Sequence, residues 1–202
     1  MRKTDEQNTE QRRQQILRAA ITCFSRNGLH GTSMVQICAE AGVSPAHPYY
    51  YFKNKEALVQ AVYLHDWDVA SRFLNSLIDA PNGLAIYLGL LRSPAHVMQD
   101  ELVTGPTFGL EVTAESGRDA DLAATLALHR KRYVAKITEI AQAAKKRGEI
   151  VEGVTIPDVV FAVQTVESAR VMALATGDHD DREYKRRART LLKGLLNLPG
   201  VN

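Results

Sequence analysis

The sequence predicts an all-α protein, and three observations support this fold class. Apolar residues recur at spacings of three and four positions along most of the 202-residue chain, which is the periodicity of an amphipathic helix. No run of alternating apolar and polar residues is long enough for a sheet. Glycine and proline mark the junctions between the apolar patterns. We expect an N-terminal arm and three-helix domain over residues 1–53 and a larger helical domain over residues 54–202.

Composition is typical of a soluble globular protein, with 45% hydrophobic and 24% charged residues. No apolar run approaches the length of a membrane span, and the polar N-terminus has no signal-peptide core. We therefore expect a cytoplasmic protein without a membrane partner. Two cysteines, Cys23 and Cys38, are too few for a disulfide framework and fit reduced core positions.

The charge is distributed unevenly along the chain. Net charge is only +2, but residues 1–60 contain eight Lys or Arg against five Asp or Glu. A mildly basic N-terminal part fits nucleic-acid binding, although many proteins that bind no nucleic acid share it. Two interpretations stay open for its first basic residues: contact with DNA, or a solvated and disordered arm. These residues are Arg2, Lys3, Arg12 and Arg13.

The first predicted helix covers residues 9–27, where apolar residues occupy one face, and Gly28 is a suitable stop. A second, short helix follows Ser33, which forms a capping box with Gln36, and Gly42 ends it. Helix, glycine turn and short helix make the helix-turn-helix arrangement.

The third short helix is expected to begin at Pro45, with Ser44 as its N-cap. Pro48 disturbs it, because proline has no N–H to donate to the Ser44 carbonyl and pushes His47 away from helical angles. The sequence therefore predicts a distorted or partly 3₁₀ first turn. Asn54 can cap the next helix, which should continue to about Asp79.

The rest of the chain is predicted to be helical, with breaks at glycine and proline. The expected helices cover residues 83–92, 94–103, 105–117, 119–147, 157–176 and 180–197.

Residues 16–58 resemble the DNA-binding domain of TetR-family transcriptional regulators. The matching pieces are "ILRAAITCFSRNG", "GTSMVQICAEAGVS" and "YYYFKNKEAL", in the family order and without gaps. The remainder is similar only in length and helical pattern. The resemblance implies a homodimer that binds a double-stranded DNA operator. It also implies a C-terminal domain that binds an unknown small-molecule effector, which lowers operator affinity.

The resemblance assigns DNA contacts by position in the motif. Major-groove contacts are expected from the start of the third helix, and backbone contacts from its end and from the start of the second helix. The groove-facing residues are Pro45, Ala46, His47 and Tyr50, and the backbone contacts are Thr32, Ser33, Tyr49, Tyr51 and Lys55.

Several of these residues have a structural alternative. Ser33 could act only as a cap, and Tyr49 or Tyr51 could pack against the first helix. Lys55 and His47 could be solvated surface residues.

An effector cavity needs apolar walls and a few polar groups. Candidates that lie near apolar neighbours on predicted helices are Trp67, Phe73, Phe108, Glu111, His129, Tyr133 and Glu167, and each of them also fits a core, surface or interface position. Glu111 and Glu115 share a helix face, but no further group completes a catalytic site, and no metal or cofactor motif is found. We therefore expect no enzyme, no cofactor and no metal.

The last two helices are expected to pair with those of a second subunit in a four-helix bundle. The apolar face predicted for this contact contains Val159, Val160, Val163, Val166, Val171 and Leu174. The main hypothesis is a ligand-responsive repressor on a palindromic operator. The alternative is a DNA-binding regulator that a protein partner controls, without a small-molecule ligand.

Overall fold

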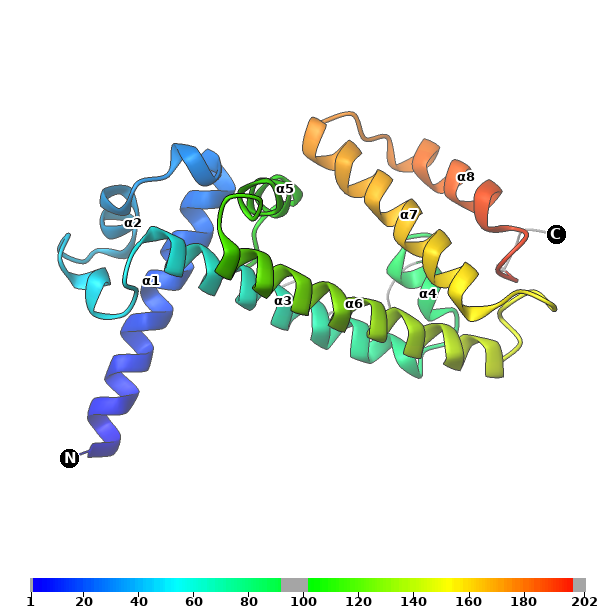
Figure 1. The fold of residues 1–202 in the computed structure, drawn as a ribbon, viewed down its shortest axis with the longest axis horizontal. Helices are drawn as coiled ribbons and strands as arrows, with labels where there is room; N and C mark the ends of the chain where they lie inside the picture. The colour runs from blue at the N-terminus through cyan, green and yellow to red at the C-terminus, as the bar shows by residue number, and fades with distance from the viewer. Residues whose placement is uncertain (1, 92–101, 198–202) are drawn as a thin grey trace. The chain divides into compact units, whose positions relative to one another are not determined.

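The structure, a computed structural model, describes residues 2–91 and 102–197, with side chains from Gln7 onward. Within these residues it contains eight α-helices, one short 3₁₀ helix and a single isolated β-bridge between Ile150 and Leu196, which confirms the all-α class (Figure 1). The helices are α1 (Arg2–Gly31), α2 (Met34–Ala41), η1 (His47–Tyr50), α3 (Lys55–Ile78), α4 (Gly83–Tyr87), α5 (Pro106–Glu115), α6 (Ala120–Lys146), α7 (Ile156–Thr176) and α8 (Asp181–Leu192).

The chain forms two compact units. Unit 1 comprises Met1–Asp68 and Leu102–Leu126, and unit 2 comprises Val69–Glu101 and Ala127–Asn202. Consequently α5 belongs with the N-terminal helices in space, although it lies in the middle of the sequence. The division at residue 53 remains a prediction about where the DNA-binding function ends.

Unit 1 is held together by an apolar core between α1, α2, the start of α3, and α5. Phe24 of α1 and Phe108 of α5 stack with their ring centroids 5.3 Å apart. Ile16, Ile37 and Leu58 are fully buried in the same core. Because such aromatic pairs and buried aliphatic side chains supply most of the hydrophobic stabilisation, α5 is an integral part of this unit.

The predicted caps of unit 1 are present. Ser33 and Gln36 form the expected capping box, with hydrogen bonds of 2.7 Å and 3.3 Å. Gly42 ends α2 in the left-handed conformation, with φ of 63°. The Asn54 side chain accepts the Ala57 amide at 2.9 Å at the start of α3. These interactions satisfy amides that a helix start leaves without an intrahelical partner.

The first helix differs from the prediction at both ends. It begins at Arg2, so the chain ahead of residue 9 is helical rather than a disordered arm. At Gly28 the backbone leaves helical geometry, with φ of 71°, before a last turn to Gly31. The expected break at Gly28 is therefore confirmed as a kink inside α1.

The third helix is a 3₁₀ turn, and the predicted α-helix from Pro45 is wrong. Only His47–Tyr50 is helical, and Ser44 accepts its bond from His47 at 2.9 Å, one residue earlier than in an α-helix. Pro45 and Pro48 cannot donate a backbone hydrogen bond, and Pro48 is buried. The predicted 3₁₀ geometry is thus present and extends over the whole element. We call residues 45–50 the recognition segment.

Unit 2 buries a second apolar core, formed by α4, the end of α3, and parts of α6, α7 and α8. The helix expected over 83–92 is shorter, because the chain turns at Gly89 with φ of 69°. Most of the helix expected over 94–103 lies outside the described residues. The last helix ends at Leu192 rather than 197, and the following residues turn back to form the bridge to Ile150.

Helix α7 packs most of the face predicted for a second subunit into the core of its own chain. Val159, Val160, Val163 and Val166 are buried in the core of unit 2, so they cannot also form a subunit contact. Phe161 and Met172 are instead 73% and 53% exposed. By length and composition alone α7 could cross a membrane, contrary to our expectation from the sequence. The charged residues Glu167 and Arg170 lie within α7, and its valine face is buried in the core of unit 2, as in a core helix of a soluble protein.

Candidate nucleic-acid interface

The recognition segment presents its first residues and two of its tyrosines to solvent. Pro45 and Ala46 are exposed, and Tyr49 and Tyr50 are 54% and 82% exposed. Aromatic side chains with this exposure have little role in the core, and a phenol offers a donor, an acceptor and an apolar ring to a partner. The segment therefore carries chemistry suited to base edges and phosphates.

His47 lies between surface and core. Its ring is tilted against Tyr51, with centroids 5.5 Å apart, and meets the Tyr50 ring edge-on. Its Nε2 atom is buried and has no hydrogen-bond partner among the described residues. In this geometry the ring supports the two tyrosines, and it has to turn before Nε2 can reach a base.

Thr32 and Ser33 stand at the start of α2 but differ in access. Thr32 is 2% exposed, and its hydroxyl lies 2.8 Å from the Gly28 carbonyl and 3.1 Å from the Cys23 carbonyl. Ser33 is exposed and holds the capping box. Of the two hydroxyls, the structure presents only that of Ser33 at the surface.

Lys55 is half-buried at the start of α3 and is engaged inside unit 1. Its ammonium donates to the Leu29 carbonyl at 2.6 Å. The same Leu29 residue donates its amide to the Glu111 carboxylate of α5, also at 2.6 Å. The carbonyl and the amide of Leu29, in the α1 kink, are therefore both hydrogen-bonded by side chains from other helices. A phosphate contact by Lys55 requires its ammonium to leave the Leu29 carbonyl.

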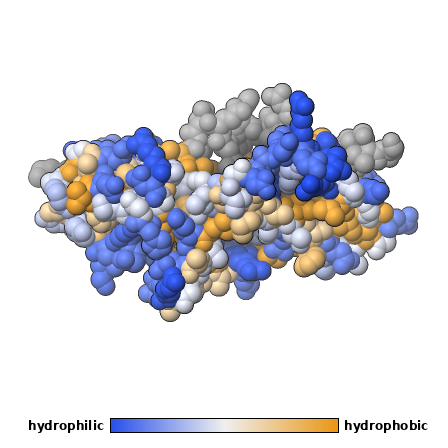
Figure 2. All heavy atoms as spheres, turned by 90° about the horizontal axis from the view of Figure 1, so that it is seen from above, coloured by the Kyte–Doolittle hydropathy of each residue, from blue (hydrophilic) through white to orange (hydrophobic). Residues whose placement is uncertain are grey.

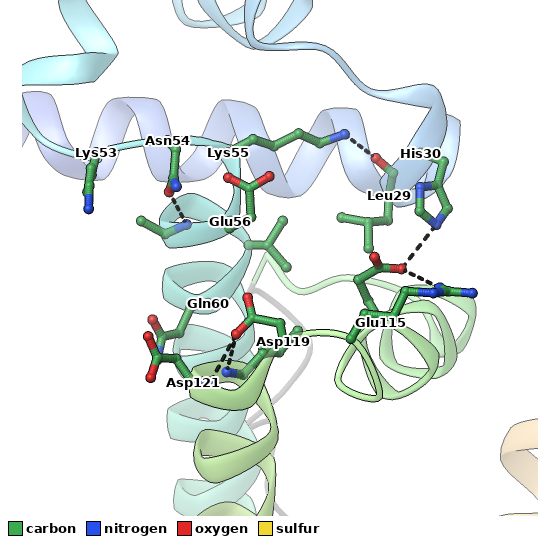
Figure 3. A pocket seen from close by; sticks show the side chains of 14 residues that line it. Leu29, His30, Lys53, Asn54, Lys55, Glu56, Gln60, Glu115, Asp119 and Asp121 are labelled. Atoms are coloured by element: carbon green, nitrogen blue, oxygen red, sulfur yellow. Dashed lines mark hydrogen bonds and ion pairs between the residues drawn. The ribbon is translucent and has the colours of Figure 1, made fainter.

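A cavity of about 520 Å³ lies beside this arrangement (Figure 3). It is lined by the start of α3, the end of α1 and the turn between α5 and α6. Glu115 reaches His30 at 3.7 Å and Arg118 at 3.1 Å, while Asp119 caps α6. These four side chains thus pair with one another or with backbone amides. The remaining lining residues include Lys53, Glu56, Gln60 and Asp121.

The seven effector candidates are divided between the two units. Phe108 and Glu111 belong to the packing of unit 1, where they contact Phe24 and Leu29. Trp67 also falls in unit 1. The others, Phe73, His129, Tyr133 and Glu167, fall in unit 2, where His129 is 3% exposed.

Tyr133 and Glu167 do share a polar cluster in unit 2. The Tyr133 and Tyr87 hydroxyls are 2.9 Å apart, and Glu167 pairs with Arg170 at 3.3 Å. Burial raises the pKa of Glu167, and burial together with the Glu167 charge raises the pKa of Tyr87. The Glu167 carboxylate and the phenol groups therefore influence each other's protonation in surroundings that exclude most of the solvent.

Three members of this cluster, Tyr87, Arg170 and Tyr184, were missed in the sequence. Tyr184 donates to the Leu88 carbonyl at 2.9 Å, and Arg170 lies over its ring at 5.8 Å. Burial raises the pKa of Tyr184 to about 12. The residues of the cluster come from four helices, and no motif connects them in the sequence.

No group of three or more His, Cys, Asp or Glu within the described residues is arranged to hold a metal. Cys23 and Cys38 are free and buried, and burial raises the pKa of both thiols. Thiols with raised pKa values are poor nucleophiles at neutral pH.

Residues 16–62 match the family described as bacterial regulatory proteins, tetR family. The chain is also 30% identical to the HTH-type transcriptional regulator UidR of Escherichia coli K12. That similarity extends over 138 residues, which is 68% of this chain and 68% of UidR. The chain belongs to the TetR family.

Solved structures of other regulators share the fold. Salmonella enterica GusR is 26% identical, with a TM-score of 0.63 over 93% of this chain and 96% of GusR. A transcriptional regulator from Saccharomonospora viridis, solved in complex with choline, is 16% identical. Its TM-score is 0.75 over 94% of this chain and 100% of that one.

The TetR-family chain is therefore a DNA-binding transcriptional regulator, and its family is not enzymatic. Residues 16–62 contain the α2 capping box and the whole recognition segment.

Proposed function

We propose that this regulator is a cytoplasmic homodimeric repressor that binds a palindromic operator and is released by a small molecule. The observation that carries the proposal is the exposed recognition segment, supported by caps at the start of α2 and α3. In a helix-turn-helix dimer, two such elements enter successive major grooves about 34–36 Å apart.

The proposed base contacts come from Pro45, Ala46, His47 and Tyr50. Ala46 is small enough to approach a thymine methyl group, and Tyr50 has the most exposed ring of the segment. The proposed backbone contacts are Thr32, Ser33, Tyr49, Tyr51 and Lys55. Among these, Ser33 and Tyr49 reach the surface directly, and Lys55 must exchange the Leu29 carbonyl for a phosphate.

The proposed dimer contact uses α7 and α8. Only 22% of the most apolar part of α7 is buried within the chain, which leaves apolar area for a second copy. Figure 2 shows that hydrophobic residues (orange) lie between hydrophilic ones on the face of the molecule drawn there. The exposed apolar residues of these two helices are Phe161, Met172, Leu174 and Leu191. Leu174 belongs to the face expected from the sequence, and the other three take the place of its buried valines.

The effector is proposed to bind in unit 2, with Tyr133 and Glu167 among its polar contacts. Support comes from their position beside buried apolar residues, because small-molecule sites combine apolar walls with a few placed polar groups. The effector would favour a conformation that binds the operator less well.

Four measurements test the proposal. Enrichment from random DNA should yield a two-fold symmetric sequence, and light scattering should give twice the chain mass. Phe161→Glu with Met172→Glu should produce folded monomers that bind the operator at least tenfold more weakly, whereas Leu128→Glu on α6, also exposed, should leave the dimer intact. An asymmetric selected site, or a monomer that binds as well as the wild type, would contradict it.

A small molecule extracted with the protein, which dissociates the operator complex on addition, distinguishes effector control from control by a protein partner.

A further inference from the structure

Arg13 of α1 lies against the end of the recognition segment. Its guanidinium carbon is 5.4 Å from the centre of the Phe52 ring, and Phe52 follows the segment by two residues. Two residues further along α1, Gln15 donates to the carbonyl of Ala41, which lies four residues before the segment, at 2.7 Å. The same stretch of α1 thus contacts the chain at both ends of the recognition segment.

The contact with Phe52 places the Arg13 guanidinium over an aromatic ring. Arginine stacks on aromatic faces through its flat surface, which leaves the N–H groups at its edge free to donate. Phe52 is 4% exposed and fully packed in the core, so it is a rigid support. The side chain of Arg13 remains 39% exposed.

The ion pair of Arg13 with Glu10 is weak. The shortest distance is 3.5 Å, and the Glu10 carboxylate is 59% exposed. Exposed pairs of this kind contribute little and exchange readily for a better acceptor. A phosphate offers two oxygens to the guanidinium edge, which is a stronger match than one solvated carboxylate oxygen.

We propose that Arg13 contacts a DNA phosphate, so that the interface extends from the helix-turn-helix to α1. The proposal rests on the proposed binding of DNA by the recognition segment. Phosphates border the major groove on both sides, and a group beside the end of the recognition segment reaches one of these borders. In Figure 1 the N-terminal turns of α1 (blue) extend past α2. The 39% exposure of the Arg13 side chain leaves it accessible to a partner.

Another arginine of α1, Arg26, provides a matched control. Arg26 lies about 20 Å along the helix from Arg13, at 1.5 Å per residue, and pairs with Glu40 at 3.2 Å. It is an arginine of the same helix with an acidic partner, but it does not contact the recognition segment. Neutralising Arg26 removes the same charge from unit 1 without removing the proposed contact.

The test measures the dissociation constant of the full-length protein for its enriched operator and for a random duplex as a function of salt. For each bound subunit, Arg13→Gln should reduce the slope of log K against log salt by about 0.9 and weaken both complexes roughly tenfold. Arg13→Lys should keep the slope, because the charge remains, with part of the affinity lost. Arg26→Gln should leave the slope unchanged.

Phe52→Leu tests the support given by the ring. It should weaken binding in the wild type but not in the Arg13→Gln background, because the ring acts through the arginine. A purely structural role of Arg13 would lower thermal stability without changing the salt slope, and that result would overturn the proposal. So would an Arg26→Gln effect as large as that of Arg13→Gln. An asymmetric enriched site with an intact Arg13 effect would contradict only the palindromic repressor, whereas a wild type that binds no duplex would overturn both.

Discussion

The carboxylate of Glu111 on α5 accepts a hydrogen bond of 2.6 Å from the backbone amide of Leu29 on α1. The two residues are 82 positions apart in the sequence. The kink at Gly28 exposes this amide, and α5 supplies the missing acceptor. Glu111 therefore supports the DNA-binding unit, although the sequence suggested an effector contact.

Glu111→Ala should lower the free energy of unfolding by about 1–3 kcal/mol, because a partly buried amide loses its charged acceptor. Glu111→Gln should lose less, since the amide oxygen can still accept. Urea denaturation measures both. Glu115→Ala is the control: its carboxylate is 33% exposed and pairs with surface cations, so it should cost at most about 1 kcal/mol. Equal losses for Glu111→Ala and Glu115→Ala would show that the Leu29 contact contributes nothing special.

Gly28→Ala should destabilise the protein by roughly 1–3 kcal/mol. Gly28 has a positive φ of 71°, and an added Cβ would lie 2.8 Å from the Glu111 carboxylate. Gly109→Ala on α5 should instead stabilise it by about 0.5–1 kcal/mol, because that glycine is helical and has open space around it. Thermal or urea unfolding distinguishes the two signs. A neutral Gly28→Ala would contradict the close approach of Glu111.

Pro48→Leu should convert the recognition segment from 3₁₀ to α-helical geometry. The new residue can donate its amide to Ser44, and it keeps an apolar side chain at a buried position. In the variant, the new amide at position 48 should be protected from hydrogen exchange, and the operator selected from random DNA should differ from that of the wild type. Pro45→Ala serves as the control, because a missing N–H at the first turn costs little. An unchanged operator preference would mean that Pro48 does not set what the segment reads.

Tyr50→Ala should weaken operator binding about tenfold and alter base preference, while stability changes by no more than about 0.5 kcal/mol because Tyr50 is 82% exposed. Tyr49→Phe should weaken operator and random DNA equally, by about fivefold, since only a hydroxyl to phosphate is lost. Competition binding with point variants of the operator separates the two patterns. The same loss on every sequence for Tyr50→Ala would place Tyr50 on the backbone.

Glu167→Gln should change how stability depends on pH. Burial raises the folded-state pKa of Glu167 above its ordinary 4.5, so the folded state holds this proton more tightly than the unfolded state. The free energy of unfolding therefore falls as pH rises from 4.5 through the raised pKa. The glutamine variant should lack this fall in urea titrations between about pH 4 and 8.

The Glu183→Gln variant should change the pH dependence of the free energy of unfolding in the opposite direction. Arg186 and Arg187 lower the pKa of Glu183 to about 2, so the contribution of Glu183 to stability is present above its ordinary pKa and is lost as pH falls towards 2.

If the Glu167→Gln variant and the wild type lost the same free energy of unfolding as the pH rises, Glu167 would not be the cause of that loss.

Interactions between neighbours in the sequence could be predicted. Ser33 with Gln36, and Asn54 with Ala57, are three residues apart, and their hydrogen bonds depend only on local backbone geometry. The 3₁₀ character around Pro48 follows from the missing N–H of one residue. The helix-turn-helix and its exposed tyrosines were therefore accessible from the sequence, together with the family.

Which apolar or charged side chain meets which partner was decided only by the tertiary structure. The valine face of α7 satisfied the periodicity of a subunit contact, yet it packs into its own core and leaves Phe161 exposed. Glu111 and Phe108 were candidates for an effector site, yet they join α5 to α1. Periodicity specifies that a helix has an apolar face, but burial depends on what long-range packing places against it. The sequence by itself determined the helices, their caps and the family, and the packing decided the partners of each face.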